Sequence, residues 1–400
     1  PEWLGHKIKV EQIIRDKLGF RGKIFFIPHH FSHAAAAFFP SQFAESAILT
    51  IDGIGEYQTT GLWRGQGGRI IPFKKIDFPH SLGLFYAAFT AFLGFRVNED
   101  EYKVMGLAAY GKPRYTDKIY QTIDVRPDGS FRLNMKYFSF REHFRMWSKN
   151  FEKLFGKPRL ADEPISARDK DLAASIQNVT EEIYFKILNH LYAITGLRNV
   201  CVSGGVALNA LANGKAYRNT PFEHMYVLGA AGDSGGALGA ALFLYHQILG
   251  NPQRTPVTNL HFGSSYEDEE IEGILKQYKL SFEKLADEDA LIRRVARLLS
   301  ENKIVGWFQG RMEFGPRALG SRSILASPKP RDMKERVNEI KLREQFRPFA
   351  GSILQEKVHE YFETPEPEHS SPFMTFCFQA KAAAKKDFAA IVHEDGSCRI

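Results

Sequence analysis

Short apolar runs alternate with stretches of helical periodicity along residues 1–250 of the chain. Apolar runs bounded by turn-forming residues predict buried strands, which we expect at residues 23–27, 46–51, 199–203 and 225–228. Periodic or alanine-rich stretches predict helices, which we expect at residues 33–39, 81–95, 169–194 and 235–249. Two β-like runs around Gly67 and Gly68 predict a hairpin over residues 59–78. This alternation indicates an α/β fold class.

The pattern changes after residue 250. The stretch at 251–260 contains two prolines and few apolar side chains, which predicts a linker between a first domain at 1–250 and a second at 261–400. Within the second domain we expect helices at 267–277 and 287–300 and a strand at 303–308. Residues 115–165 are polar, aromatic and aperiodic, so we interpret them as an insertion in the first domain.

Composition narrows the class of protein. Hydrophobic residues make up 44% and charged residues 25% of the 400 positions, which is typical of a globular protein and leaves no membrane-spanning run. Three widely separated cysteines form neither a disulfide framework nor a metal knuckle, so we expect a reducing, cytoplasmic location. The net charge of +7 suits anionic small substrates and nucleic acid equally well, but no zinc finger or RNP-type aromatic motif supports nucleic-acid binding. We therefore expect neither a membrane nor a nucleic-acid partner.

His29 and His33 are spaced i, i+4, so on a helix they share one face and can hold one metal ion. Zinc peptidases use this spacing with a glutamate directly after the first histidine, but this chain has His30 there and lacks that general base. We interpret His30 as a neighbour of the ligands or a surface residue. The alternative is that all three histidines simply face solvent beside Pro28.

Two aspartates extend the candidate metal site. Asp52 follows a predicted strand, and Asp233 follows another strand and a glycine-rich turn. Carboxylates at the carboxyl ends of strands converge where α/β sheets bind ligands. Two histidines and one or two aspartates leave open positions on a divalent metal such as iron. The alternative for each aspartate is a helix N-cap or turn residue.

A double glycine marks a candidate nucleotide site. Gly204 and Gly205 lie between a predicted strand and a helix expected to begin near Val206, where backbone N–H groups can bind phosphate. A second glycine-rich junction at 228–233 suggests that a nucleotide lies between the two. Tight helix–strand packing is the alternative explanation. Neither junction matches a P-loop or a dinucleotide fingerprint.

Residues 309–347 are strongly basic, with ten lysines and arginines against five acidic residues. Arginine forks bind phosphates and carboxylates through two hydrogen bonds at once. We favour Arg311, Arg317, Arg322 and Arg343 for this role. The charges at 331–336 are better explained as a solvated helix face.

Five long motifs occur together and in order: His-His-x-x-His-Ala at 29–34, Tyr-Lys-Val-Met-Gly-Leu-Ala-Ala-Tyr-Gly at 102–111, Ser-Gly-Gly-Val-Ala-Leu-Asn at 203–209, Gly-Asp-Ser-Gly-Gly-Ala-Leu-Gly-Ala-Ala at 232–241, and Gln-Gly-Arg-Met-Glu-Phe-Gly-Pro-Arg-Ala-Leu-Gly-Ser-Arg-Ser-Ile-Leu at 309–325. With them the chain resembles the ATP-dependent O-carbamoyltransferases of the nodulation, cephamycin and tobramycin type. The resemblance covers nearly the whole length of the chain.

The resemblance implies an actin-like (ASKHA) transfer domain followed by an α+β YrdC-like domain. It implies that carbamoyl phosphate and ATP give carbamoyl-adenylate, and that the carbamoyl group passes to a hydroxyl of a small-molecule acceptor. It also implies an iron held by His29, His33, Asp52 and Asp233. Family members begin before Pro1 and continue beyond residues 393–399, so we expect a fragment truncated at both ends.

The resemblance and the residue chemistry together give a set of expected site residues. Catalytic roles are expected for Asp52, which could serve as a general base, and for Arg311 and Arg317. Binding of ATP and carbamoyl phosphate is expected at Lys103, Gly106, Gly204, Gly205, Asn209, Arg311, Glu313, Arg322, Lys341 and Arg343. The rival interpretations are a tRNA-modifying transferase of the threonylcarbamoyl type and a non-catalytic, actin-like nucleotide-binding protein. The sequence is also compatible with a homo-oligomer.

Overall fold

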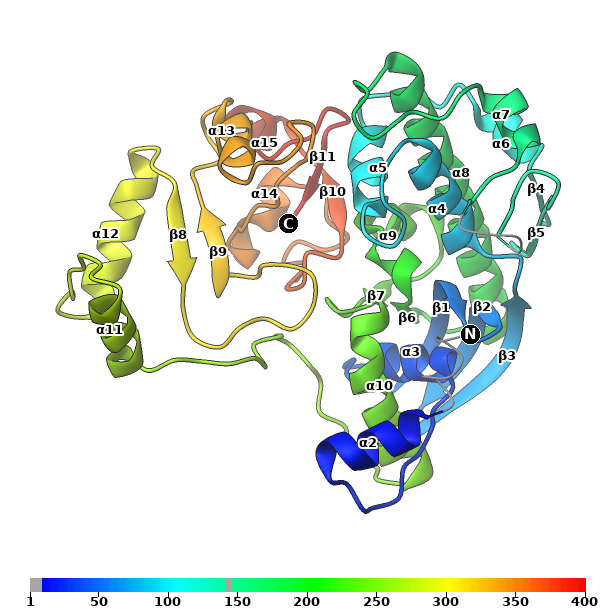
Figure 1. Cartoon of the computed structure of the whole chain (residues 1–400), viewed down its shortest axis with the longest axis horizontal. Coiled ribbons are helices and arrows are strands. Elements are labelled where there is room, and N and C mark those ends of the chain that lie inside the picture. Colours follow the sequence, from blue (N-terminus) through cyan, green and yellow to red (C-terminus); the bar gives the residue numbers. More distant parts are fainter. Residues whose placement is uncertain (1–8, 141–144) are drawn as a thin grey trace.

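The computed structural model describes residues 9–140 and 145–400, and a mixed five-stranded sheet lies at the centre of the first half of the chain (Figure 1). The strand order is β3-β2-β1-β6-β7, with the bounds β1 Glu45–Gly55, β2 Gln58–Gln66, β3 Arg69–Asp77, β6 Asn199–Ser203 and β7 His224–Tyr226. The β1–β2 and β2–β3 pairs are antiparallel, and the β1–β6 and β6–β7 pairs are parallel. The α/β class and the hairpin over 59–78 are therefore confirmed.

Helices cover both faces of this sheet because the side chains of β1 alternate between two apolar clusters. Ile48 packs with Phe38 of α3 (His29–Phe38) on one face. Leu49 and Ile51 belong to the larger cluster on the other face. Several helices contribute to it, among them α4 Leu82–Phe92, α5 Glu101–Ala108 and α8 Ala167–Thr195. The predicted helices at 81–95 and 169–194 are confirmed, and the Ser81 Oγ caps α4 as expected.

The segment at 115–165 is more ordered than its composition suggested. Its described residues, 115–140 and 145–165, form four short elements: α6 Thr116–Tyr120, β4 Ile123–Val125, β5 Phe131–Leu133 and α7 Lys149–Phe155. The ring of Phe151 lies 5.0 Å from the rings of both Phe89 and Phe92, measured between centroids. Aromatic side chains from the segment complete the core beside α4, and its interpretation as an insertion stays a prediction.

Other local predictions need correction. Residues 23–27 form no strand, because no strand of the described sheet pairs with them and Phe26 is 64% exposed. The strand expected at 225–228 is the shorter β7. The helix expected at 235–249 is divided into a 3-10 turn, a short helix and a π-helix: η2 Asp233–Gly235, α10 Gly236–Leu242 and η3 Phe243–Ile248. A helix that was not predicted, α2 (Val10–Leu18), precedes α3.

The predicted linker has no regular structure, yet its Arg254 is firmly held. The Arg254 guanidinium donates hydrogen bonds to the carbonyl groups of Phe43 (2.7 Å), Ser41 (3.0 Å) and Phe39 (3.3 Å). It also lies 4.0 Å from the ring centroid of Phe38. One side chain therefore satisfies the carbonyl groups that follow the end of α3.

The second half of the chain contains short elements. The predicted helices at 267–277 and 287–300 and the strand at 303–308 are confirmed as α11 Asp268–Gln277, α12 Glu288–Ser300 and β8 Val305–Phe308. They are followed by β9 Arg322–Leu325, α13 Met333–Ile340, η4 Gln355–Lys357, α14 Val358–Tyr361, β10 Cys377–Gln379, α15 Ala382–Asp387 and β11 Ser397–Arg399. Figure 1 shows α11, α12, β8 and β9 well away from the five-stranded sheet, and the remaining elements nearer to it.

Apolar side chains of the last part of the chain join the main core. Phe362, Phe378 and Ile400 belong to the same buried cluster as Leu49 of β1. The domain division at 251–260 stays a prediction, since the two sides of this segment share a core as well as a connection. Among the described residues, no helix is both long enough and apolar enough to cross a membrane.

Candidate metal centre and cationic cavity

Four side chains capable of binding a metal come together from three segments of the chain. His29 and His33 lie one turn apart on α3, Asp52 lies on β1, and Asp233 begins η2. One ligand atom from each residue lies within 4.8 Å of the others. Asp52 Oδ2 is 2.9 Å from His29 Nε2 and 3.3 Å from His33 Nε2. Asp233 Oδ1 lies 3.5 Å and 3.4 Å from the same nitrogens.

This donor set fits a divalent first-row metal ion. The Nε2 atoms of His29 and His33 face each other at 2.9 Å, a separation that a shared proton or a shared metal ion can satisfy. Two imidazoles with two carboxylates suit several such metals, iron among them. Asp52 does not end its strand as predicted, since β1 continues to Gly55, but the pairing is irregular between Ile51 and Gly55.

Ser203 orients one of the histidines. Its Oγ donates its single proton to the carbonyl of Ala231 at 2.9 Å, so it can only accept a hydrogen bond from His33 Nδ1 at 3.1 Å. In neutral His33 the proton therefore lies on Nδ1, and the lone pair of Nε2 points toward the other ligand atoms. Such support of a ligand histidine by a neighbouring side chain is typical of metal sites. Ser203 begins the sequence motif at 203–209, but no role was predicted for it.

Asp52 is fully engaged at both oxygens. Oδ1 accepts the Gly205 N–H at 2.9 Å, while Oδ2 faces the two histidines. Burial opposes ionisation, but hydrogen bonds from His29 and His33 outweigh it and hold the pKa of Asp52 well below its usual range. Burial likewise opposes charge on His33, but hydrogen bonds to Asp233 and Asp52 raise its pKa to about 9. A carboxylate with such a low pKa is a poor general base, so the geometry favours Asp52 as a ligand.

His30 does not face solvent. Its Nε2 donates to the carbonyl of Gln58 at 2.9 Å, and its Nδ1 accepts from the Thr50 Oγ at 2.8 Å. Burial, followed by the charge of His33, lowers the pKa of His30 to about 4, so the ring stays neutral. Its hydrogen bonds therefore fix α3 against β1 and β2, directly beside His29 and His33.

The glycine pair has two different structural functions. Gly204 has a φ of +103°, and an added Cβ would overlap with the carbonyl group of Ile51. Gly205 uses its N–H to hold Asp52, and an added Cβ would lie 2.9 Å from Asp52 Oδ1. In this structure the pair packs against β1 and holds Asp52 in place, and the Gly205 N–H already donates to Asp52 Oδ1.

The segment after the glycines also differs from the prediction. Residues Gly205–Leu208 form a 3-10 turn, η1, and the helix α9 (Ala210–Asn219) begins later than expected. The Asn209 Oδ1 accepts the N–H of Ala212 at 3.1 Å and so caps α9. The Asn209 Nδ2 donates to the Oε1 of Gln177 on α8 at 3.0 Å. These contacts are within the protein and leave Asn209 as a structural connection between two helices.

A loop from the second half of the chain docks on both glycine junctions. Gly315 has a φ of +110°, and an added Cβ would lie 3.3 Å from Ala230. Arg317 is partly buried and donates from Nη2 to the carbonyl of Leu208 at 3.2 Å. Burial lowers the pKa of Arg317 to about 9, and its Nε has no partner among the described residues. A predicted catalytic arginine is thus brought beside the turn that supports Asp52.

The other residues predicted from this loop bind backbone groups of the loop itself or of the segment at 262–263. Arg311 donates to the carbonyl groups of Phe262 and Gly263, each at 3.0 Å. The Arg322 guanidinium lies 3.5 Å from the ring centroid of Phe308 and donates to nearby carbonyl groups. Glu313 accepts the N–H groups of Leu319, Ser321 and Arg322 at 2.6–3.1 Å. All three residues therefore fix the conformation of the loop through contacts within the protein.

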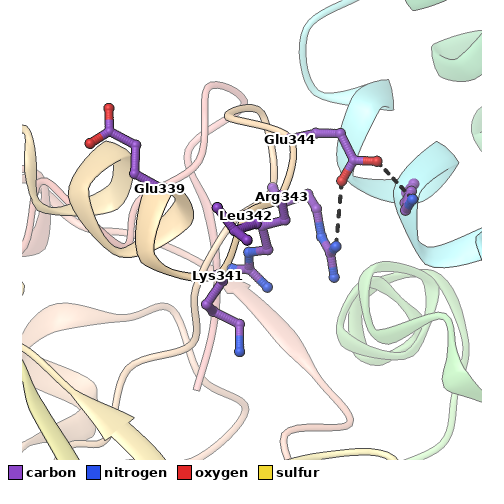
Figure 2. A pocket seen from close by; sticks show the side chains of 7 residues that line it. Glu339, Lys341, Leu342, Arg343 and Glu344 are labelled. Atoms are coloured by element: carbon purple, nitrogen blue, oxygen red, sulfur yellow. Dashed lines mark hydrogen bonds and ion pairs between the residues drawn. The ribbon is translucent and has the colours of Figure 1, made fainter. Parts of the chain in front are cut away.

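A cavity of about 770 Å³ lies between α5 and the loop that follows α13 (Figure 2). Its lining is mostly basic: Lys103, Lys341, Arg343 and Arg347, together with Glu339, Leu342 and Glu344. Burial, followed by the charges of Arg343 and Arg347, lowers the pKa of Lys341. Burial and the charge of Arg347 lower the pKa of Arg343 to about 10. The Arg343 Nη2 is buried without a partner among the described residues. A bound anion would stabilise the positive charges of Lys341 and Arg343 and could supply the missing hydrogen-bond acceptor.

The cavity brings together predicted and unpredicted residues. Lys103, Lys341 and Arg343 were expected to bind ATP or carbamoyl phosphate, whereas Arg347 and Glu344 were not singled out. Gly106, also expected there, accepts a hydrogen bond from His393 Nε2 at 2.8 Å through its carbonyl group. The spacing of Arg343 and Arg347 was visible in the sequence, but nothing local showed that Lys103 lies beside them.

Comparison with known proteins defines the class. The Carbamoyltransferase N-terminus family model matches residues 4–242, and the Carbamoyltransferase C-terminus model matches residues 296–400. A chain that matches both of these models is a protein of the carbamoyltransferase class. This chain belongs to the carbamoyltransferase family.

Individual relatives agree with this assignment. The uncharacterized protein sll1178 of Synechocystis sp. is 47% identical over 93% of this chain and 63% of its own length. Nodulation protein NolNO of Sinorhizobium fredii is 37% identical over 94% of this chain and 54% of its own length. Nodulation protein NolO of Bradyrhizobium diazoefficiens is 36% identical, with 93% and 66% covered. The chain thus spans less than two thirds of the length of these relatives.

Among solved structures, HypF of T. kodakarensis matches 61% of this chain and 39% of its own length, with 15% identity and a TM-score of 0.33. A similarity at that level carries no argument about this protein.

Proposed function

We propose that this protein transfers a carbamoyl group from carbamoyl phosphate, through carbamoyl-adenylate, to a hydroxyl group of a small-molecule acceptor. The observation that carries the proposal is the presence of two separate sites in one carbamoyltransferase-family chain. One is the cluster of His29, His33, Asp52 and Asp233, and the other is the cationic cavity. A protein that only bound a nucleotide would need no second site of this kind.

The proposed chemistry has two stages. Carbamoyl phosphate and water give carbamate and phosphate, and a carbamate oxygen then attacks the α-phosphorus of ATP and displaces pyrophosphate. The acceptor hydroxyl oxygen next attacks the carbamoyl carbon, AMP leaves with the bonding electrons, and the hydroxyl proton is lost. Adenylation is needed because carbamate itself is a poor electrophile with a poor leaving group.

Residues of the cavity suit the first stage. Lys103, Lys341, Arg343 and Arg347 present a cationic surface that can neutralise a triphosphate and the departing pyrophosphate. The Arg343 Nη2 is buried without a partner among the described residues, so a movement of the side chain that exposes it to a phosphate oxygen would break no hydrogen bond of this atom.

The histidine and aspartate cluster suits the second stage. His29, His33, Asp52 and Asp233 would hold a divalent metal, for which we propose iron. When bound, such an ion supplies Lewis acidity toward a phosphate or carbamoyl oxygen. Ser203 keeps the His33 Nε2 lone pair available for it, and the Gly205 N–H keeps Asp52 in place. Arg317 lies beside the same turn and can offer its unpartnered Nε to an anion passing between the stages.

Two variants separate the two stages. Arg343→Gln should abolish the carbamoyl-phosphate-dependent exchange of labelled pyrophosphate into ATP, because it removes a donor from the cavity. His33→Ala should leave that exchange intact and stop transfer to a hydroxyl acceptor, because it removes a ligand from the other site. Arg293→Gln is the matched control, since Arg293 is an exposed arginine on α12 and its change removes the same charge. Equal loss of exchange in the first two variants would refute the two-site proposal.

A further inference from the structure

Glu344 is an acidic residue in an otherwise basic part of the cavity wall. Its Oε1 lies 2.7 Å from Lys103 Nζ, and its Oε2 lies 3.4 Å from Arg347 Nη1. Figure 2 draws both ion pairs. The pair with Lys103 links α5 to the loop after α13, whereas the pair with Arg347 lies within that loop. Lys103 and Glu344 are separated by 241 residues in the sequence.

Two oxygens of one anionic group thus bridge two cations, as a phosphate would. Burial raises the pKa of Glu344, but the hydrogen bond from Lys103 outweighs it and lowers the pKa, so the carboxylate is ionised. Its side chain is 36% exposed, which leaves it free to rotate out of the cavity. Lys103 would not be stranded by that movement, because its Nζ also lies 3.1 Å from Asp100 Oδ1.

The other carboxylate in the wall behaves differently. Glu339 also lines the cavity, but its side chain forms no ion pair or hydrogen bond among the described residues. Figure 2 shows Glu339 and Glu344 pointing away from each other, with Arg343 and Leu342 between them. The bridging position therefore belongs to Glu344 specifically and is not a general property of acidic residues in the wall.

We infer that Glu344 is an internal competitor for the phosphate-binding position of this cavity, and that a phosphate-bearing ligand must displace it from Lys103 and Arg347. The inference rests on the proposed function, in which the cavity binds phosphate groups. Displacement breaks the ion pair between Lys103 on α5 and Glu344 in the second half of the chain. Ligand binding therefore removes one of the contacts that join the two halves. A ligand with a single negative charge competes poorly with Glu344, whereas a polyphosphate can also interact with Lys341 and Arg343, which line the same cavity.

The first test measures binding of inorganic pyrophosphate by isothermal titration calorimetry to the wild type, Glu344→Gln and Glu339→Gln. Both variants remove one negative charge from the cavity wall, so the general electrostatic gain is matched. Only Glu344→Gln also frees Lys103 and Arg347. We expect its Kd to be about five-fold lower than that of Glu339→Gln, which is the upper range for releasing a partly exposed ion pair. Thermal melting of each variant checks that the fold is retained.

The second test adds Lys103→Met in the wild-type and Glu344→Gln backgrounds as a double-mutant cycle. In the wild type, Lys103 exchanges one anion for another when pyrophosphate binds, so its loss should cost little affinity. In Glu344→Gln, Lys103 is free of that partner, so its loss should cost several-fold more.

The outcomes separate the inference from the proposed function. If no variant binds pyrophosphate, the cavity is not a phosphate site and the proposed function loses its first stage. If the wild type binds pyrophosphate but Glu344→Gln matches Glu339→Gln, the site stands and the competitor role of Glu344 is overturned. An equal cost of Lys103→Met in both backgrounds overturns it too.

Discussion

The Gly205 N–H provides the most direct way to test whether the geometry around Asp52 matters. Gly205 has no positive φ, so alanine is compatible with its backbone conformation. An added Cβ, however, would lie 2.9 Å from Asp52 Oδ1, closer than carbon and oxygen atoms normally approach. Either the carboxylate or the turn must move, and the 2.9 Å hydrogen bond that fixes Asp52 is weakened.

The size of the effect follows from what Asp52 holds. A movement of a few tenths of an ångström changes both its contact with His29 (2.9 Å) and its contact with His33 (3.3 Å). Loss of a partner that orients a metal ligand typically costs about 10- to 100-fold in metal affinity. We expect Gly205→Ala to lose affinity within this range, because it disturbs the hydrogen bond without removing the ligand itself.

The assay is a titration of the metal-free protein with Fe(II) under anaerobic conditions, with Co(II) as a spectroscopic substitute, and metal content is checked by elemental analysis. Gly53→Ala is the control, because Gly53 is the neighbour of Asp52 in the sequence and an added Cβ there meets no atom within 4 Å. Wild-type affinity in a folded Gly205→Ala protein would refute the reasoning. Equal losses of metal affinity in Gly205→Ala and Gly53→Ala would also contradict the reasoning, because only the alanine at 205 would contact the Asp52 carboxylate.

Three further predictions concern neighbouring features. Gly204→Ala should lower the melting temperature by several degrees, because the side chain would overlap with the Ile51 carbonyl at a φ of +103° and such strain costs about 1–3 kcal/mol; an unchanged melting curve would contradict this. Ser203→Ala should weaken metal binding about ten-fold with little loss of stability, because His33 Nδ1 loses its acceptor; calorimetric metal titration beside a melting curve measures both. Arg254→Ala should lower the free energy of unfolding by about 2 kcal/mol, because hydrogen bonds from a charged group to buried carbonyl groups are lost. Urea denaturation measures this free energy, and an unchanged value would show that the bonds contribute nothing.

Local signals in the sequence determined much of the fold. Helical periodicity predicted α8, a serine N-cap predicted the start of α4, and two adjacent glycines predicted the turn between β2 and β3. These features succeed because periodicity, capping and turn formation act over a few neighbouring residues. The same reasoning failed at 23–27, where a short apolar run has no partner strand among the described residues. At 115–165 it recognised the aromatic composition but not that these side chains pack on α4.

The candidate site was determined by the sequence only in part. The i, i+4 spacing fixed His29 and His33 on one helix face, and the ends of predicted strands suggested Asp52 and Asp233, which the structure brings together. The partners that orient them were not readable, because a hydrogen bond such as that from His33 to Ser203 depends on how α3 and β6 pack.

Only the tertiary structure decided how the two halves of the chain meet. Arg317 reaches Leu208, and Glu344 reaches Lys103, across 109 and 241 residues respectively. No local pattern specifies such contacts, since they arise when the shared core that includes Phe378 and Leu49 closes and brings distant loops together. The sequence thus determined which residues carry charge and can bind metal or phosphate. The packing of that core determined which of them face one another, and therefore which are free to bind a ligand.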